Sequence, residues 1–306
     1  MKVVARKRPM VSIILRPNAP RMFVATDWSE LEVAQVQGRS RLITCRNLQP
    51  LKILNPAAPA GSCHAVLSSY GGGMVAGDTI RLRIKGGPNT KLFLSSQANT
   101  KIFKSIDGQV AEQHIAGELA AGALAVVFPD PVVPQAGSRY RQLQHWHLAP
   151  DSLLLVADWL HSGRMDIGEK FEFHSFFSEL KVYRQGRLVL LDRFAFHPQE
   201  QVATAPANFG AYQTVLSFYL VGSPHDPRFV RLAQQFQQLK LSIPDTPQFD
   251  LSGHDCLVSV TQAKEDAYVL RAAAHSRQAL QPLCAQVLQA LAEEALFGYN
   301  PLARKY

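Results

Sequence analysis

The stretch that decides the fold reads SSYGGGMVAGDTIRLRIK and covers residues 68–85. Its glycines form a turn, and Ile80, Leu82 and Ile84 then alternate with polar residues, which is the period of a β-strand. Glycine loops that bind phosphate need a helix after the turn, because the amino end of a helix supplies oriented N–H groups. The run also lacks the Gly-Lys-Ser/Thr ending of a P-loop. It therefore predicts a turn that enters a strand and excludes a nucleotide site here.

Short strands between glycine or proline turns continue outward from this stretch. From about residue 13 to 221 their spacing favours stacked sheets over alternating strands and helices, although no repeat of fixed period is visible. The predicted fold class is mainly β (α+β), with a layered, solenoid-like antiparallel β body. The predicted strands are 31–36, 41–44, 65–69, 79–85, 91–95, 123–128, 140–148, 152–160, 170–183 and 187–196.

The C-terminal third, residues 222–306, breaks this rhythm and predicts an α+β tail. Apolar residues at helical spacing predict one helix over 227–240 and a second over about 276–296, which Gly298 ends. Two strands, 256–261 and 267–273, lie between the helices. We expect both helices to pack on the sheet and the whole chain, 1–306, to form a single domain.

The composition is typical of a globular protein that stays in the cytoplasm. The chain has 306 residues, 47% of them hydrophobic, and no run of the ~20 apolar residues that a membrane helix needs. No apolar signal-peptide core follows the basic N-terminus. The formal net charge is +8, but basic residues are scattered along strands, which favours an acidic protein partner over nucleic acid. The four cysteines show no Cys-x-x-Cys pair and indicate reduced thiols.

Four motifs follow one another along the chain: the Gly-Gly-Gly-x-x-x-Gly-Asp turn within 68–78, LFLSSQANTKIFKS at 92–105, PDPVVP at 129–134 followed by Gly137–Tyr140, and GRMDIGEKF at 163–171. In this order they resemble motifs of the urease accessory protein UreD (UreH) family. The closing NPLARKY also resembles the family's Pro-Arg-Lys-aromatic end. Tyr70 replaces a usual proline, and Ser95–Ser96 replaces a pair of threonines. The resemblance covers nearly the whole chain, from about residue 38 to 306.

The resemblance implies a non-catalytic role in urease maturation. It implies a strand-dominated layered body with two helices. It also implies a scaffold that binds apo-urease, recruits UreF and through it the GTPase UreG, and offers Ni²⁺ a path to the urease active site. Delivery requires release, so weakly binding oxygen ligands suit this role better than a cage of His and Cys. We expect no tightly bound cofactor, only Ni²⁺ in transit.

Two carboxylates stand in apolar strands, where a charge is costly. Asp158 follows LLLVA and shares a strand face with Leu154 and Val156, and Asp192 follows LVLL. A buried ionised carboxylate is strongly destabilising unless it is paired or binds a cation. One interpretation is an internal salt bridge. The other, drawn mainly from the resemblance, is a water-filled passage lined with acids that carries a divalent cation. The candidate salt-bridge partners are Arg139, Arg164 and Arg193.

Asp78 and Glu169 join the candidates only because each lies in a matched motif. Each follows a glycine, and the ordinary interpretation is a carboxylate that caps turn amides for Asp78 and a solvated turn residue for Glu169. The complete candidate set for transient Ni²⁺ is therefore Asp78, Asp158, Glu169 and Asp192. We predict no catalytic residue.

Two other classes of function stay open. A metal-dependent hydrolase would use His145 and His147, which share one face of a strand, although the simpler interpretation is a polar outer face with Trp146 turned inward. The other class is a β module that binds polyanions or carbohydrate through basic faces and exposed aromatic residues. The chain has neither a Gly-x-Ser-x-Gly nor a His-Glu-x-x-His signature for hydrolysis.

Overall fold

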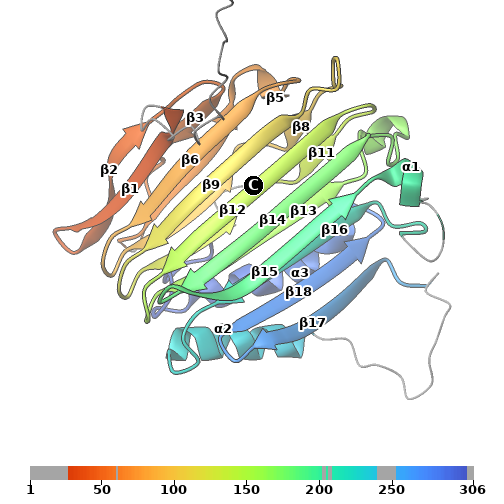
Figure 1. The fold of residues 1–306 in the computed structure, drawn as a ribbon. Helices are drawn as coiled ribbons and strands as arrows, with labels where there is room; N and C mark the ends of the chain where they lie inside the picture. Colours follow the sequence, from red (N-terminus) through yellow and green to blue (C-terminus); the bar gives the residue numbers. More distant parts are fainter. Residues whose placement is uncertain (1–26, 60, 202–204, 206–208, 240–252, 302–306) are drawn as a thin grey trace, which may run out of the picture.

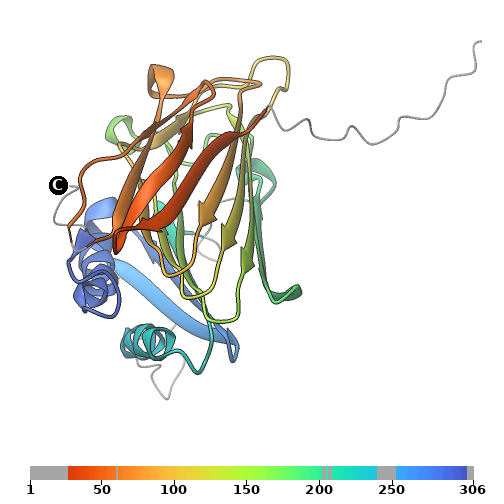
Figure 2. The same cartoon turned by 90° about the vertical axis from the view of Figure 1, so that its left-hand side faces the viewer.

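The computed structural model of the chain describes residues 27–59, 61–201, 205, 209–239 and 253–301. The predicted beginning of the body at residue 13 and the last five residues of the NPLARKY end lie outside the described residues. Most of the described chain forms two β-sheets that face each other, and the two longer helices lie on one side of the pair (Figures 1 and 2).

Sheet A has seven strands, in the order β15-β14-β12-β9-β6-β1-β2. Sheet B has eleven: the main path β17-β18-β16-β13-β10-β7-β4-β3, and a short side ladder of β5, β8 and β11. The strands of sheet A are β1 (Ser29–Val36), β2 (Arg39–Arg46), β6 (Thr79–Gly86), β9 (Ala111–Leu119), β12 (Arg139–Leu148), β14 (Ser175–Arg184) and β15 (Arg187–Phe196). The strands of sheet B are β3 (Leu51–Leu54), β4 (Cys63–Ser69), β5 (Gly73–Met74), β7 (Lys91–Ser96), β8 (Thr100–Ile102), β10 (Leu124–Phe128), β11 (Val132–Pro134), β13 (Leu153–His161), β16 (Thr214–Val221), β17 (Cys256–Lys264) and β18 (Ala267–Ala274).

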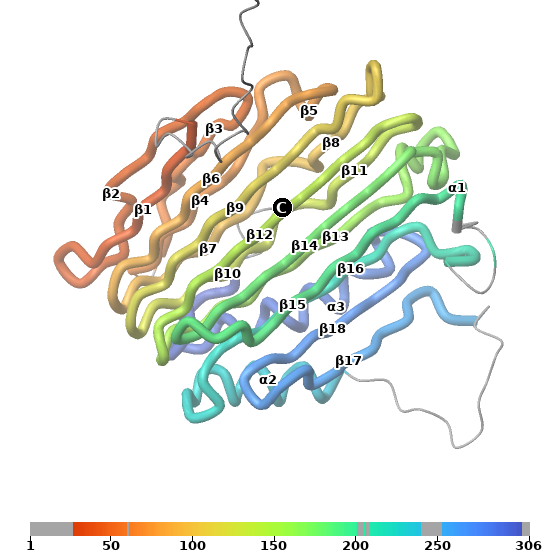
Figure 3. Tube along the Cα trace, viewed as in Figure 1, coloured from red at the N-terminus to blue at the C-terminus, as the bar shows by residue number. Residues whose placement is uncertain are grey.

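The mainly β, layered and solenoid-like arrangement is confirmed, but the prediction of an antiparallel body is wrong for the central strands. Neighbours such as β9 and β12, or β10 and β13, pair in parallel. The reason is that successive long strands alternate between the sheets: the chain forms β4 in sheet B, β6 in sheet A and β7 in sheet B again (Figure 3). Each return to a sheet restores the original direction. Antiparallel pairs such as β1–β2 and β14–β15 occur toward the edges.

The crossings between the sheets are long at one end of the sandwich and short at the other. At the long end, sheet B connects to sheet A through residues 70–78, 97–110, 129–138 and 162–174, and these segments include the side ladder β5-β8-β11. In Figure 1 the arrowheads of β6, β9 and β12 point away from this end. All four motifs that carry the resemblance therefore reach the same end of the molecule.

Two hydrophobic cores hold the layers together. Inward residues of both sheets, among them Leu82, Trp146 and Val156, form the core between the sheets. The other face of sheet B, with Leu155 and Phe218, packs against the helices. Strands of sheet B are thus buried on both faces, which explains continuous apolar runs such as LLLVA before Asp158.

Both predicted C-terminal helices are present. The first, α2 (Pro227–Gln238), has Asp226 as its N-cap, whose side chain accepts a 2.8 Å hydrogen bond from Arg228 N. The second, α3 (Arg277–Gln289), is shorter than predicted. It runs into a 3₁₀ turn at 290–292 and stops where Glu293 becomes extended, so Gly298 does not cap it. A short helix, α1 (Pro198–Gln201), follows β15.

The strands β17 and β18 match the two strands predicted for the tail. They extend sheet B of the body, because β18 pairs with β16 and β17 follows β18 at the edge. The sequence does not predict the short strands β3, β5, β8 and β11, nor β9 and β16. The longer two are missed because β9 has Gln113 and Gly117 at inward positions and β16 is almost continuously apolar. The strand predicted over 170–183 begins only at Ser175, after a long-end crossing. None of the helices in the described ranges is both long and apolar enough to cross a lipid bilayer.

Candidate functional site

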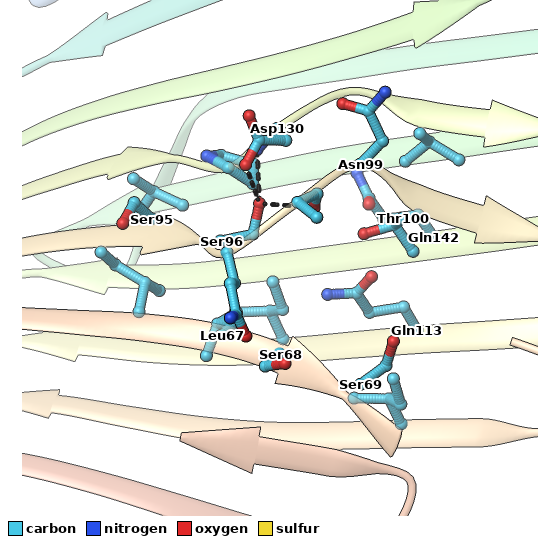
Figure 4. A pocket seen from close by; sticks show the side chains of 18 of the residues that line it. Leu67, Ser68, Ser69, Ser95, Ser96, Asn99, Thr100, Gln113, Asp130 and Gln142 are labelled. Atoms are coloured by element: carbon cyan, nitrogen blue, oxygen red, sulfur yellow. Dashed lines mark hydrogen bonds between the residues drawn. The ribbon is translucent and has the colours of Figure 1, made fainter. Parts of the chain in front are cut away.

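A cavity of about 300 Å³ lies between the sheets beneath the long end (Figure 4). Sheet A lines it with Gln113, Gln142 and Gln144, and sheet B contributes Ser96 and Asp158. At ~30 Å³ for each water molecule, this volume has room for about ten waters. An apolar core fills much of the remaining space between the sheets. The cavity, whose wall combines these polar side chains with apolar ones, is therefore the part of the interior where a hydrated ion fits.

The first three long-end motifs meet at this cavity. The glycine turn contributes Ser68, Ser69 and Gly72, the second motif contributes residues 97–100, and the PDPVVP motif contributes Asp130. Gly72 is exposed, and so are the first residues of the crossing 97–110. The cavity wall therefore reaches the surface of the molecule here. The motifs are far apart in the sequence, and the stacking of successive crossings in a solenoid brings them side by side.

Asp158 projects from β13 into the cavity wall and is half-buried. The Ser178 hydroxyl on β14 donates a 2.5 Å hydrogen bond to Asp158 Oδ2, and Gln142 Nε2 donates to Ser178 Oγ at 3.3 Å. The Tyr140 hydroxyl extends this network, at 3.1 Å from Gln142 Oε1 and 2.8 Å from Gln113 Oε1. Neutral groups of sheet A thus hold the carboxylate that sheet B presents.

The surroundings of Asp158 disfavour its ionised form. Burial raises the pKa of its carboxyl above the ordinary value, hydrogen bonds from Ser178 and Gln142 lower it, and the negative charge of Asp192 raises it. The net direction is upward. A cation that entered the cavity would favour the ionised carboxylate, because an opposite charge compensates the loss of hydration.

Asp192 forms an internal salt bridge, but its partner is Arg271 and not one of the three arginines proposed from the sequence. Arg271 on β18 donates to Asp192 Oδ1 at 2.5 Å, and the Tyr219 hydroxyl donates to Oδ2 at 2.5 Å. Among the described residues no arginine forms an ion pair with Asp158. Of the three candidate arginines, Arg193 and Arg164 pair with other carboxylates.

A line of polar groups therefore leads from the cavity toward the side of the molecule. The buried Tyr219 hydroxyl lies near both carboxylates: burial raises its pKa well above the ordinary value, and the charges of Asp158 and Asp192 raise it further. The line ends at the Arg271 side chain, which is 50% exposed, whereas that of Asp192 is 16% exposed.

One buried carboxylate of the cavity wall, Asp130, is absent from the candidates predicted from the sequence. Its side chain is 3% exposed. Ser96 Oγ donates to Asp130 Oδ2 at 2.9 Å (Figure 4), and Arg277 at the start of α3 donates to Oδ1 at 3.1 Å. The flanking prolines indicate an ordinary turn, and the arginine partner is far away in the sequence. The only signal available was its place in a matched motif.

Of the four candidates, Asp158 lines this cavity, whereas Asp192, Asp78 and Glu169 do not. Asp78 Oδ2 accepts a 2.9 Å hydrogen bond from Val75 N, so it stabilises the glycine turn. Glu169 is buried rather than solvated: its side chain is 4% exposed and lies 2.6 Å from Arg164. It also packs on Gly163, where an added Cβ would lie 2.8 Å from Glu169 Oε1. Local structure thus accounts for both carboxylates.

The two histidines lie on the outer face of sheet A, and Trp146 between them is fully buried. His145 Nε2 is 3.4 Å from Glu179 Oε1, and the His147 ring stacks on Tyr183 with the centroids 4.9 Å apart. Across the described ranges, no group of three or more His, Cys, Asp or Glu residues is placed to hold a metal ion. The arrangement matches the simpler interpretation of a polar outer face.

Comparisons with known proteins give the same family as the motifs. The family described as UreD urease accessory protein matches residues 27–305. The urease accessory protein UreD of Cytophaga hutchinsonii is 33% identical over 280 residues, which cover 90% of this chain and 97% of that protein. The protein of the same name from Sorangium cellulosum is 32% identical over 277 residues, 90% of this chain and 83% of its own length. Urease accessory protein D of Arabidopsis thaliana is 34% identical over 195 residues, 62% and 66% of the two chains.

Proposed function

The chain belongs to the UreD urease accessory protein family, and on this premise we propose that it is a non-catalytic scaffold of urease maturation through which Ni²⁺ reaches apo-urease. The protein binds apo-urease and UreF, and through UreF the GTPase UreG, in the cytoplasm. Nickel is its cargo, and it holds no cofactor tightly. The ion passes through the cavity between the sheets and then along Asp158 and Asp192.

The observation that carries the proposal is the half-buried Asp158, which lies among the polar side chains of the cavity wall. Its hydrogen-bond partners are a hydroxyl and an amide, and the charge that acts on it is that of a second carboxylate, Asp192. A carboxylate in such surroundings lacks a compensating positive charge, which an arriving Ni²⁺ supplies. The path then continues to Asp192, whose carboxylate is paired with Arg271. While the ion passes, its positive charge takes the place of the arginine beside this carboxylate.

The chemistry of the wall suits transport better than storage. Ni²⁺ binds imidazole and thiolate ligands tightly, and the oxygen atoms of carboxylates, amides, hydroxyls and water more weakly. The lining offers such oxygens from Gln113, Gln142, Ser96 and Asp158. An ion that keeps most of its water and exchanges one or two ligands at a time can enter and leave.

The test is urease activation with substitutions at the two carboxylates. The chain is co-expressed with apo-urease, UreF and UreG, and nickel bound per urease active site is measured after Ni²⁺ and GTP are added. We expect Asp158→Ala and Asp192→Ala to lower nickel loading by roughly fivefold or more, since removing a charged ligand costs about 1 kcal/mol or more. Assembly of the complex should be unchanged.

Two further variants make this result specific. Asp158→Asn keeps the shape and removes only the charge, so it should reproduce the loss of nickel loading in a folded protein. Asp151→Ala removes an exposed carboxylate in a short crossing at the opposite end and should have no effect. Normal nickel loading in both folded Asp158 variants would rule out the proposed path, and failure of the wild-type chain to bind any urease component would rule out the scaffold.

A further inference from the structure

The outer face of sheet A is left uncovered by the described residues. The helices α2 and α3 pack on the outer face of sheet B, and Figure 2 shows them on that side of the sandwich only. Sheet A presents its outer face toward the viewer in Figure 1, and its strands β1, β6, β9, β12 and β14 pair in parallel. Parallel sheets are usually covered on both faces. This face therefore has the character of a surface that another molecule covers.

This face carries a net positive charge, although the described residues as a whole contain nearly as many acidic as basic side chains. Outward positions carry three arginines on β2, two arginines and a lysine on β6, two arginines on β12, a lysine on β14 and an arginine on β15. Five glutamates oppose these ten cations: two on β1, two on β9 and one on β14. Over all the described residues, basic and acidic side chains are almost equal in number. The cations are thus gathered on one face.

Several of the glutamates are already neutralised within the face. Glu179 lies 2.7 Å from Lys181 and 2.5 Å from Arg193, and Glu30 lies 3.2 Å from Arg83. The cations of β2, β6 and β12 spread the positive charge from one edge strand to the middle of the sheet. It forms a broad field that attracts a negatively charged surface and raises the rate of encounter.

We propose that the outer face of sheet A docks against an acidic surface of a folded protein partner in the urease maturation complex, an inference that rests on the proposed function. The area fits: seven strands ~4.8 Å apart, each about eight residues long at ~3.3 Å per residue, cover roughly 800 Å², the share of one partner in a stable interface. The occupant is a protein rather than a nucleic acid. Glutamates interspersed among the cations repel phosphates, whereas side chains such as Phe177 and Leu191 suit a protein surface.

The test reverses the charge of three side chains on this face: Arg81→Glu, Lys85→Glu and Arg141→Glu combined. The full chain is co-expressed with apo-urease, UreF and UreG, and the composition and dissociation constant of the assembly are measured at low and high salt. We expect the triple variant to lose at least one component or to bind it at least tenfold more weakly. The wild-type assembly should weaken as NaCl screens the charges.

A matched triple variant, Lys52→Glu, Arg231→Glu and Lys264→Glu, makes the same charge change on exposed residues of sheet B and α2. It should assemble like the wild type. Unchanged assembly of the sheet A variant, with the wild-type assembly insensitive to salt, would overturn the proposal. Loss of binding to RNA or heparin with normal protein assembly would do so too, in favour of a polyanion. A wild-type chain that binds no urease protein would overturn both this proposal and the scaffold.

Discussion

At the scale of single residues, the buried carboxylates are compensated in different ways. Glu169 is paired with Arg164, and Asp192 with Arg271. Asp158 has only neutral hydrogen-bond donors, beside a cavity; these donors lower its pKa, but burial outweighs them and the pKa is raised. Since local pairing explains the first two charges, the uncompensated one is the better pointer to function. The sequence predicts that Asp158 and Asp192 are costly, but it does not predict which of them has an arginine.

Glu179 gives a test of side-chain electrostatics on the outer face of sheet A. Burial raises the pKa of this carboxyl, but hydrogen bonds from Lys181, Arg193 and His145 outweigh it and lower the pKa to about 2 from the ordinary 4.5. A lowered pKa in the folded state stabilises the fold fully above the unfolded-state value, and this contribution is lost as the pH falls from about 4.5 toward 2.

We therefore expect Glu179→Gln to lower the free energy of unfolding by about 1–3 kcal/mol at pH 7. The difference between wild type and variant should shrink steadily as the pH falls from 5 toward 2 (the range set by the two pKa values). Urea unfolding at a series of pH values measures it. A difference that does not change with pH would contradict the assigned ion pairs.

At the scale of elements, one glycine makes room for a tryptophan of the neighbouring strand. Gly117 on β9 pairs with Trp146 on β12, and the indole ring lies over the glycine. A Cβ at position 117 would come within 2.0 Å of the ring. A tryptophan that is fully buried in a well-packed core has no room to move aside.

Gly117→Ala is expected to destabilise the protein by roughly 2–4 kcal/mol, or to prevent folding, because overpacking forces the ring or the backbone to shift. Thermal or urea unfolding measures the loss. Gly253→Ala is the matched control, since nothing lies within 4 Å of the added Cβ. In the double variant Gly117→Ala, Trp146→Leu the loss should be smaller than the sum of the two single effects. Strict additivity would mean that the two residues do not clash.

The elements also show where sequence patterns are informative. Strands with one solvent-facing side, such as β6 and β12, alternate in hydrophobicity, and their positions are predicted to within a residue or two. The pattern fails at β9, where the polar Gln113 faces inward and lines the cavity, and at β16, which is apolar on both faces. Inward-facing polar residues belong to the candidate site, so the failure at β9 marks the same feature that the site depends on.

At the scale of the whole molecule, arginines of the two helices fasten them to opposite ends of the sandwich. Arg228 in α2 donates to the carbonyl oxygens of Gly122 and Asp151, at 3.0 and 2.9 Å, in two successive short crossings. Arg277 in α3 reaches Asp130 at the long end. Through Arg228, α2 thus connects two neighbouring turns of the solenoid, in addition to their strand pairing and core packing.

Arg228→Ala should lower the free energy of unfolding by about 1–2 kcal/mol, because it leaves two backbone carbonyls without this donor and removes the contact with Asp226. Arg231→Ala in the same helix removes an exposed ion pair with Glu293, at 2.6 Å, and should cost less than about 0.5 kcal/mol. Denaturant unfolding of both variants gives the comparison. Equal losses would show that α2 is not fastened through Arg228.

The sequence by itself determined the mainly β character, most strand positions, the two C-terminal helices and the family, because these depend on hydrophobic periods, turn residues and motifs that are local along the chain. Only the tertiary structure decided the parallel pairing, since it follows from the alternation of successive strands between two sheets. It also decided which residues meet. The cavity joins Ser96, Asp130 and Asp158, and Asp192 meets Arg271, through contacts between distant segments that no local pattern records.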